Sequence, residues 1–597
     1  MENNNDEEVS LWGFNQKGKN KKGMYINSKF RVNNLLNINL DDDVDTLIHI
    51  FKIFYRMGAE LKSNEIKMIM SFIDVEKISK AKDKIVMSNF FEKPESFEKS
   101  INDLLSGNYN AFCSTSSIVL EGIKNSENKR TNLGIKRNSS YVIDDYIEIV
   151  SSSAFRRLQD KAQVYSLEER DFVRSRLTHS YEVSANCELI ASYIDFAKCF
   201  YPDEYKKQNE IKKFAEDCIY TARCAGLLHD IGNPPFGHYG ENIIKKFFKE
   251  KNIIEKELGE KYSDFVKFDG NAQALRIVTK LQYFGEKDNL ALTSTSLGTI
   301  IKYPFSSNYN YIVDDEIKDK FSYFQSEENV IQMLECFGTY KEYIRNPLSL
   351  ILEAADDISY LTADLEDAIH KGLVSYNGLI SSLGNNDDHK VKEFKEKIEK
   401  IYQKELEKYK ETYLNSNDEA RIFECTMRPI IEKLRRELVI SCAKKFVSDK
   451  KKIIDDGIDV RKEPNYDLVG ELTEYKALIR IIKGFMKGIY KAKEINELEI
   501  TGDRVLSLIL NEYYDAIYSA SVDFKKKEFK WDDNRGDYYK KIMSFISKDF
   551  MNSFFKSVDE KSLNRDVLYY KMHLLVDYVS GMTDSYAYDM YKLLSGM

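Results

Sequence analysis

Residues that break helices are scarce along this chain, and this scarcity limits the folds that it can adopt. Only 8 prolines and 27 glycines occur among 597 residues. A sandwich or barrel of short strands needs turn residues roughly every 8 to 12 positions. Amphipathic stretches rich in lysine and glutamate fill much of the sequence instead, and 31% of the residues are charged. The sequence therefore predicts an all-α protein.

Composition narrows the class of protein further. A hydrophobic content of 43% is enough for a large core, and a net charge of -8 gives no overall signature of nucleic-acid or membrane-surface binding. No apolar run approaches the roughly 20 residues of a membrane-spanning helix. The start of the chain lacks a basic-then-apolar secretion signal. The 8 cysteines form no CxxC pair. We expect a cytoplasmic protein without membrane contact.

Changes in sequence pattern divide the chain into three regions. Residues 1–135 begin as a polar stretch and continue with helical patterns, and we interpret them as a partly flexible N-terminal extension of unknown role. Residues 136–375 carry polar residues at helical positions that should face a core, which is typical of a functional site. We expect the catalytic domain there. Residues 376–597 are predicted to form a further helical region.

The sharpest motif is HDIGNPPFGHYGE, residues 229–241. His229 and Asp230 end an apolar helical run, just before residues that break helices. Neighbouring helix residues point about 100° apart. Both side chains can therefore reach one metal ion only if it lies off the helix end and other helices supply further ligands.

Two other segments can supply those ligands. His179 follows Arg174 and Arg176, which places two cations beside an imidazole where a phosphate could dock. Asp356 lies among apolar neighbours in a strong helical pattern, where a carboxylate needs a partner. Two imidazoles and two carboxylates suit Mn²⁺, Mg²⁺, Fe²⁺, Co²⁺ or Zn²⁺. Such an ion would promote hydrolysis of phosphate esters.

Two short spacings add acid/base and sugar-binding candidates. His238 and Glu241 share a helix face at three residues apart, so the carboxylate can orient the imidazole for proton transfer. Tyr360 and Asp364 follow Asp356 at four and eight residues, so an aromatic ring and a second carboxylate lie along the face of the metal ligand. That face could bind a sugar.

Six segments in order between residues 142 and 375 resemble those of one known family. They are SSSAFRRLQDKAQV, RLTHSYEV, HDIGNPPFGHYGE, DGNAQALRI, IKYP and EAADDISYLTADLEDAI. The chain resembles the deoxynucleoside triphosphate triphosphohydrolases, the dGTPase-like branch of the HD-domain superfamily. The resemblance implies an HD-domain helical bundle that cleaves a dNTP into a deoxynucleoside and tripolyphosphate.

The resemblance also implies a role for each candidate residue. The metal ligands would be His179, His229, Asp230 and Asp356, and the catalytic pair would be His238 and Glu241. The deoxyribose would contact Gln163, Tyr360 and Asp364, and the phosphates would contact Arg176, Lys302 and Tyr303. Asn271, Gln273 and Arg276 would line the site.

Cofactor and partners follow from the same resemblance. Mn²⁺ or Mg²⁺ would be the metal, and dGTP the favoured substrate. Family members commonly form homo-oligomers, often hexamers, and we expect residues 376–597 to contribute to the nucleotide pocket and to oligomer contacts. DNA or a second nucleotide could act as an effector.

Two alternatives remain open from the residues. A 5'-nucleotidase or a nucleic-acid phosphodiesterase with an HD domain would share the metal ligands, but it would lack the sugar-side set Gln163, Tyr360 and Asp364. A nucleotide-sensing assembly would use the site to bind rather than to catalyse.

Overall fold

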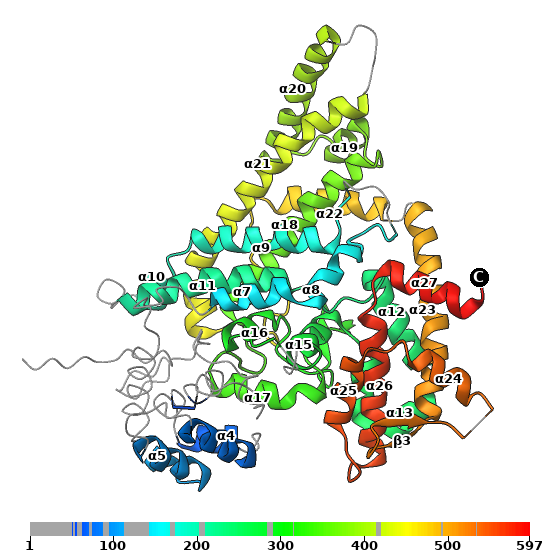
Figure 1. The fold of residues 1–597 in the computed structure, drawn as a ribbon. Helices are drawn as coiled ribbons and strands as arrows, with labels where there is room; N and C mark the ends of the chain where they lie inside the picture. Colours follow the sequence, from blue (N-terminus) through cyan, green and yellow to red (C-terminus); the bar gives the residue numbers. More distant parts are fainter. Residues whose placement is uncertain are drawn as a thin grey trace, which may run out of the picture.

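The protein folds into packed helices with only two short hairpins in the described part of the chain (Figure 1). The computed structural model describes residues 51, 54–55, 63–70, 75–87, 95–112, 142–167, 173–201, 209–282, 290–314, 316–412, 419–490, 493–532 and 534–597. The all-α prediction is confirmed.

The element bounds follow the chain. The helices up to residue 300 are α3 (Ser63–Met70), α4 (Val75–Met87), α5 (Glu95–Leu105), α7 (Val142–Ser151), α8 (Ser153–Arg157), α9 (Arg176–Ser192), α10 (Phe196–Phe200), α11 (Asn209–Leu228), α12 (Gly237–Lys249), α13 (Asn252–Leu258), α14 (Ser263–Val266), α15 (Gly270–Lys280) and α16 (Ser294–Ile300). The later helices are α17 (Glu328–Cys336), α18 (Pro347–His370), α19 (Tyr376–Leu383), α20 (His389–Thr412), α21 (Glu419–Ser448), α22 (Lys476–Ile489), α23 (Lys493–Ser519), α24 (Gly536–Met543), α25 (Lys548–Ser557), α26 (Asn564–Ser580) and α27 (Asp584–Ser595). The single-turn 3₁₀ segments are η1 (Leu158–Asp160), η2 (Gly259–Tyr262) and η3 (Gln325–Glu327), and η4 (Lys451–Asp456) is a π-helix. The antiparallel hairpins are β1 (Tyr311–Val313) with β2 (Glu316–Lys318), and β3 (Ser521–Asp523) with β4 (Glu528–Lys530).

Three helices at the centre of the molecule, α9, α11 and α18, pack against one another (Figure 1). Local sequence fixes where two of them begin. Ser175 caps α9 by accepting a hydrogen bond from the Thr178 backbone, and Asn346 caps α18 next to Pro347 at its first position. These caps set the register of the helices that carry His179 and Asp356.

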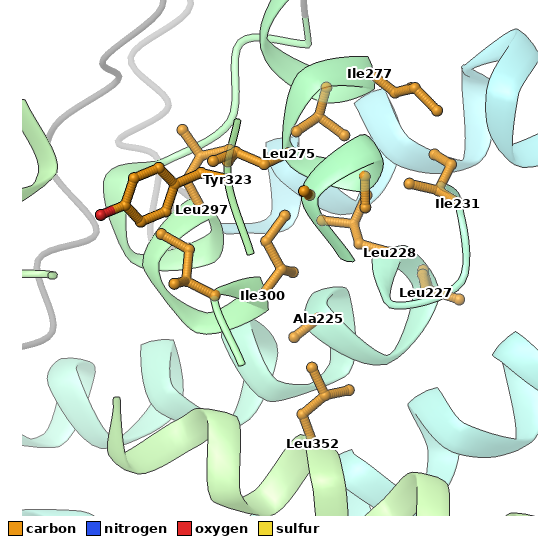
Figure 2. Packing of buried hydrophobic residues seen from close by; sticks show 14 of the residues in the cluster. Ala225, Leu227, Leu228, Ile231, Leu275, Ile277, Leu297, Ile300, Tyr323 and Leu352 are labelled. Atoms are coloured by element: carbon orange, nitrogen blue, oxygen red, sulfur yellow. The ribbon is translucent and has the colours of Figure 1, made fainter. Parts of the chain in front are cut away.

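The apolar core lies directly beneath the His-Asp motif. Leu227 and Leu228 at the end of α11 pack with residues of α15, α16 and α18, among them Leu275, Ile300 and Leu352 (Figure 2). All of these side chains are buried. The turn that follows Leu228 therefore packs on a buried apolar core.

The helices after residue 375 pack on the central part in two places. Helix α21 packs on α18 and pairs with α20, and the pair projects from the body of the molecule (Figure 1). Helices α23, α26 and α27 pack together, and α23 also packs on α12. The predicted domain boundary near residue 135 lies outside the described residues, and the division at residue 375 stays a prediction. No helix in the described part of the chain combines the length and apolar character that a bilayer-spanning segment requires.

Helices α9 and α11 approach most closely at a glycine. A Cβ at Gly226 would lie 2.5 Å from Ser184 Cα and 2.7 Å from Ser184 N, both backbone atoms of α9. Only glycine permits this approach, which sets the separation of the two histidine-bearing segments.

Replacing this glycine should therefore separate the helices. We expect Gly226→Ala to lower the free energy of unfolding by about 1–3 kcal/mol, because backbone atoms must move to admit the methyl group. Gly484→Ala is the matched control, since a Cβ there meets no described atom within 4 Å. It should raise stability by about 0.5–1 kcal/mol, because alanine favours the helix. Urea unfolding of both variants measures the difference, and equal stability of the two would contradict the packing argument.

Candidate functional site

The predicted metal ligands come together where α9, α11 and α18 meet. Ligand atoms of His179, His229 and Asp230 all lie within 4.8 Å of one another. Asp356 Oδ1 lies 3.1 Å from His179 Nε2 and 3.6 Å from His229 Nε2. Because α11 ends at Leu228, His229 and Asp230 lie in the turn beyond the helix end. These two metal-ligand candidates therefore lie beyond the end of α11, as the sequence required.

The side chains present fit a divalent metal ion. His229 Nδ1 lies 2.8 Å from the Gly226 carbonyl oxygen, so this nitrogen carries the proton. The lone pair of Nε2 then faces the cluster, and this buried atom has no hydrogen-bond partner among the described residues. Two imidazole nitrogens and two carboxylates form a nitrogen and oxygen donor set suited to such an ion.

Polar neighbours orient Asp230. Asn233 Nδ2 donates to its Oδ1 at 2.5 Å, and Arg176 donates to its Oδ2 at 2.7 Å. Burial would raise the pKa of Asp230, but the charges of Arg176 and His229 hold it well below its usual range. The carboxylate is therefore ionised and ready to bind a cation. Arg176, predicted to contact phosphate, lies against this metal ligand.

The predicted acid/base pair is formed. His238 Nδ1 lies 3.0 Å from Glu241 Oε2, and Glu241 Oε1 accepts a hydrogen bond of 2.9 Å from the Gly270 backbone. Burial would raise the pKa of Glu241, but Lys320 and His238 lower it to about 2. An ionised carboxylate only accepts hydrogen bonds, so His238 Nδ1 carries the proton and leaves Nε2 for a reacting oxygen. The His238 side chain is 76% exposed, so that nitrogen is accessible.

The sugar-side candidate Tyr360 on α18 borders a cavity of about 470 Å³, whereas Asp364 does not line it. Its lining includes Asp356, Tyr360, Lys483 and Tyr490. Tyr490 donates a hydrogen bond of 2.6 Å to Asp364 Oδ2, and its ring centroid lies 6.0 Å from that of Tyr360. Burial raises the pKa of Asp364 to about 7. The cavity thus has an aromatic wall and a carboxyl group held behind it.

A second cavity, of about 660 Å³, borders two of the three phosphate-side candidates, Lys302 and Tyr303. Lys302, Tyr303, Lys320 and Arg345 contribute to its lining, together with Glu353 on α18. Glu353 lies 3.2 Å from Lys302 and 2.6 Å from Arg345, measured between nitrogen and oxygen atoms. Several cations around one cavity form a site that a polyphosphate chain would complement.

Gln163 has a buried polar atom without a hydrogen-bond partner among the described residues. The residue lies in the segment between η1 and α9, and the unpaired atom is its Oε1. A buried unpaired polar atom is costly.

Three of the neighbouring candidates are paired with carboxylates, and their role beside the site stays a prediction. Arg174 does not lie free beside the cluster, because it pairs with carboxylates of α9 and α18, namely Glu182, Glu366 and Asp367. Gln273 and Arg276 do not line either cavity, because both donate to the buried Asp577 on α26. The partners on α18 and α26 are far away in the sequence, so the local pattern could not reveal them.

Sequence reasoning missed three residues that border the site. Lys320 lies 3.1 Å from Asp269 Oδ2 and 3.9 Å from Glu241 Oε2, and these carboxylates outweigh burial and raise its pKa. Arg345 and Tyr490 complete the two cavities. Lys320 follows a mixed-charge stretch, and Tyr490 comes 126 residues after Asp364, so no local signal distinguished them.

The helical bundle, the His-Asp turn and the surrounding ligands define an HD-domain protein, and residues 176–287 match the HD domain family. A deoxyguanosinetriphosphate triphosphohydrolase-like protein of Listeria monocytogenes is 31% identical over 487 residues, covering 79% of this chain and 98% of the relative. Deoxyguanosinetriphosphate triphosphohydrolases of Salmonella schwarzengrund and Klebsiella pneumoniae are each 29% identical, covering 75% of this chain and 92% of each relative. The chain belongs to the deoxyguanosinetriphosphate triphosphohydrolase family.

Metal binding at the cluster should stabilise the fold. Because a ligand that binds only the folded state adds about 2.7 kcal/mol at one hundred times its Kd, Mn²⁺ or Mg²⁺ should raise the Tm of the metal-free protein. Asp230→Ala should abolish the increase, whereas His370→Gln, on α18 beside Glu424, should preserve it. Thermal scans after chelation test this. A metal-dependent increase that survives in Asp230→Ala would place the ion elsewhere.

Proposed function

We propose that the protein hydrolyses deoxynucleoside triphosphates at the α-phosphorus, releasing a deoxynucleoside and intact tripolyphosphate. One observation carries the proposal. Helix α18 supplies a metal-ligand candidate, Asp356, to a cavity with an aromatic wall, and Glu353 to a cavity whose lining holds five cationic and three acidic side chains. A nucleoside complements the first and a triphosphate chain the second. The scissile bond would then lie near the His-Asp cluster.

His179, His229, Asp230 and Asp356 would hold Mn²⁺ or Mg²⁺, which supplies charge neutralisation and an acidified water when bound. Asn233 and Arg176 orient the Asp230 carboxylate for that purpose.

His238 would exchange a proton at Nε2. Glu241 holds Nδ1 and thereby fixes the tautomer and the orientation of the ring. Water attacks phosphorus, the bond to the nucleoside oxygen breaks, and the imidazole assists the attack and the departure of that oxygen.

Binding at the two ends would set specificity. Gln163, Tyr360 and Asp364 would contact the deoxyribose, with the 3'-hydroxyl as the group that satisfies Gln163 Oε1. Lys302 and Tyr303 would bind the phosphate chain, and Arg176 would add a phosphate contact once the metal holds Asp230. The names of the relatives make dGTP the first substrate to test.

Product analysis tests the proposed reaction. Purified protein with Mn²⁺ or Mg²⁺ is incubated with each dNTP and with GTP, and nucleoside, phosphate, pyrophosphate and tripolyphosphate are resolved. We expect equal amounts of deoxynucleoside and tripolyphosphate, and loss of both in Asp230→Ala, because the metal ligand is removed. Monophosphate products would favour a different phosphohydrolase. Intact substrates, alone and in a mixture of all four dNTPs, would favour a nucleotide-sensing protein.

The Tyr490 hydroxyl should matter for substrate binding. Tyr490→Phe removes the hydrogen bond that holds Asp364, so we expect the KM for the preferred dNTP to rise about 10-fold. Tyr475→Phe is the matched control, because that hydroxyl donates to Glu437 at 3.1 Å and neither residue lines the 470 Å³ cavity. Steady-state kinetics of both variants gives the two KM values that are compared. An unchanged KM in Tyr490→Phe would exclude this role.

Several expectations stay predictions: the homo-oligomer, the binding of DNA or of an effector nucleotide, the cytoplasmic location and the role of residues 1–135.

A further inference from the structure

The turn between α26 and α27, close to the C-terminal end of the chain, lies against the segments that carry the candidate site. Lys161 Nζ donates to the Asn233 carbonyl oxygen at 2.5 Å and to the Ser580 carbonyl oxygen at 2.8 Å. Lys161 is 3% exposed, so both hydrogen bonds are buried. A single ammonium group therefore joins the end of α26 to the turn after the His-Asp pair.

Asp584, the first residue of α27, makes a second connection with both of its oxygens. Oδ1 accepts a hydrogen bond of 3.0 Å from the Phe236 backbone, and Oδ2 accepts one of 3.2 Å from the Ala162 backbone. The residue is 2% exposed. Ala162 immediately precedes Gln163, and Phe236 lies two residues before His238. One carboxylate thus holds two segments that are remote in sequence, one on the sugar side and one on the acid/base side.

The Phe236 segment needs such a support. Phe236 has φ 61° and ψ 19°, and Gly237 has φ 57°, so two successive residues adopt the left-handed conformation. A bulky residue avoids that conformation unless its surroundings impose it. The Phe236 ring packs against Gly502 of α23, and Asp584 takes up its backbone N–H. These two contacts fix the direction in which α12 leaves the turn, and with it the place of His238.

The chemistry of the two donors requires a carboxylate. Both groups are backbone N–H donors, so the side chain between them must offer two acceptors. An asparagine would present an NH₂ group to one of the two N–H groups and would leave that donor buried without a partner. Burial raises the pKa of Asp584, and the hydrogen bonds from the Phe236 and Ala162 backbones together with the charges of Lys161 and Arg176 act against this shift.

We infer that Asp584 is a positioning residue that sets the distance between Gln163 and His238. Helix α27 thereby holds the sugar-binding group and the proton-transfer group at a fixed separation. The inference rests on the proposed function of those two residues. Asp584 acts through them and does not itself contact the substrate.

A double-mutant cycle on the full-length protein tests the inference. With the preferred dNTP and Mn²⁺, we expect Asp584→Asn to lower kcat about 30-fold, because a misplacement of the order of 1 Å can cost about 100-fold. In the His238→Ala background the same substitution should change kcat less than about 3-fold, because the group that it positions is gone. Asp589→Asn, on the same helix and paired with Lys592 at the surface, should leave kcat and KM unchanged.

Hydrogen exchange gives a readout independent of activity. In Asp584→Asn, peptides that contain residues 160–165 or 233–241 should exchange faster than in the wild-type protein, and those of Asp589→Asn should not. If Asp584→Asn does not fold, Asp584→Glu can be used in the same cycle, because it keeps both acceptors but moves them by one methylene group.

The outcomes separate the two claims. Absence of dNTP hydrolysis in the wild-type protein, or full activity of His238→Ala, would count against the proposed function. If the wild-type protein is active, an equal loss from Asp584→Asn in both backgrounds would overturn the inference, because it would show a general structural role. Wild-type kinetics in both Asp584→Asn and Asp584→Glu would overturn it as well.

Discussion

Four carboxylates around the candidate site are buried or half-buried, and each lies beside a cationic or imidazole group. Asp230 pairs with Arg176, Asp356 with His179, Glu241 with His238 and Lys320, and Glu353 with Lys302 and Arg345. A buried charge without a partner would cost several kcal/mol, so these pairs constrain how the surrounding helices can pack. They also keep the site polar enough for a metal ion and a polyanion to replace some of the pairings.

The site is assembled from both halves of the chain. Helices α9 and α18 and the turn after α11 supply the metal-ligand candidates, whereas Tyr490, the residue that follows α22, contributes to the aromatic cavity. Helix α26 holds α15 through the pairing of Arg276 with Asp577, and α15 begins at Gly270, whose N–H binds Glu241. The C-terminal helices are therefore part of the support of the candidate catalytic groups. This arrangement explains why relatives match the chain over about 490 residues and not over the HD segment alone.

Short-range predictions and long-range predictions fared differently. The pairing of His238 with Glu241 follows from helix geometry, because residues three apart share a face. The approach of Asp356 to His179 was expected from the kind of side chain and from family resemblance, and the structure provides the distance. Arg174 pairs with carboxylates of α18 that come almost 200 residues later, which no local pattern indicates. No residue close to Gln273 or Arg276 in the sequence indicates that both side chains contact Asp577.

The sequence by itself determined that the chain is helical, where the helix-ending His-Asp turn lies, and which residue types could bind a metal and move a proton. These properties depend on local periodicity, on helix-breaking residues and on side-chain chemistry. All three can be recognised within a segment of a few helical turns. Only the tertiary structure decided that Lys320 approaches Glu241, that Tyr490 holds Asp364, and that Asp584 supports two distant segments. Contacts of this kind depend on how the whole chain packs, because an isolated segment carries no information about which buried donor it will meet.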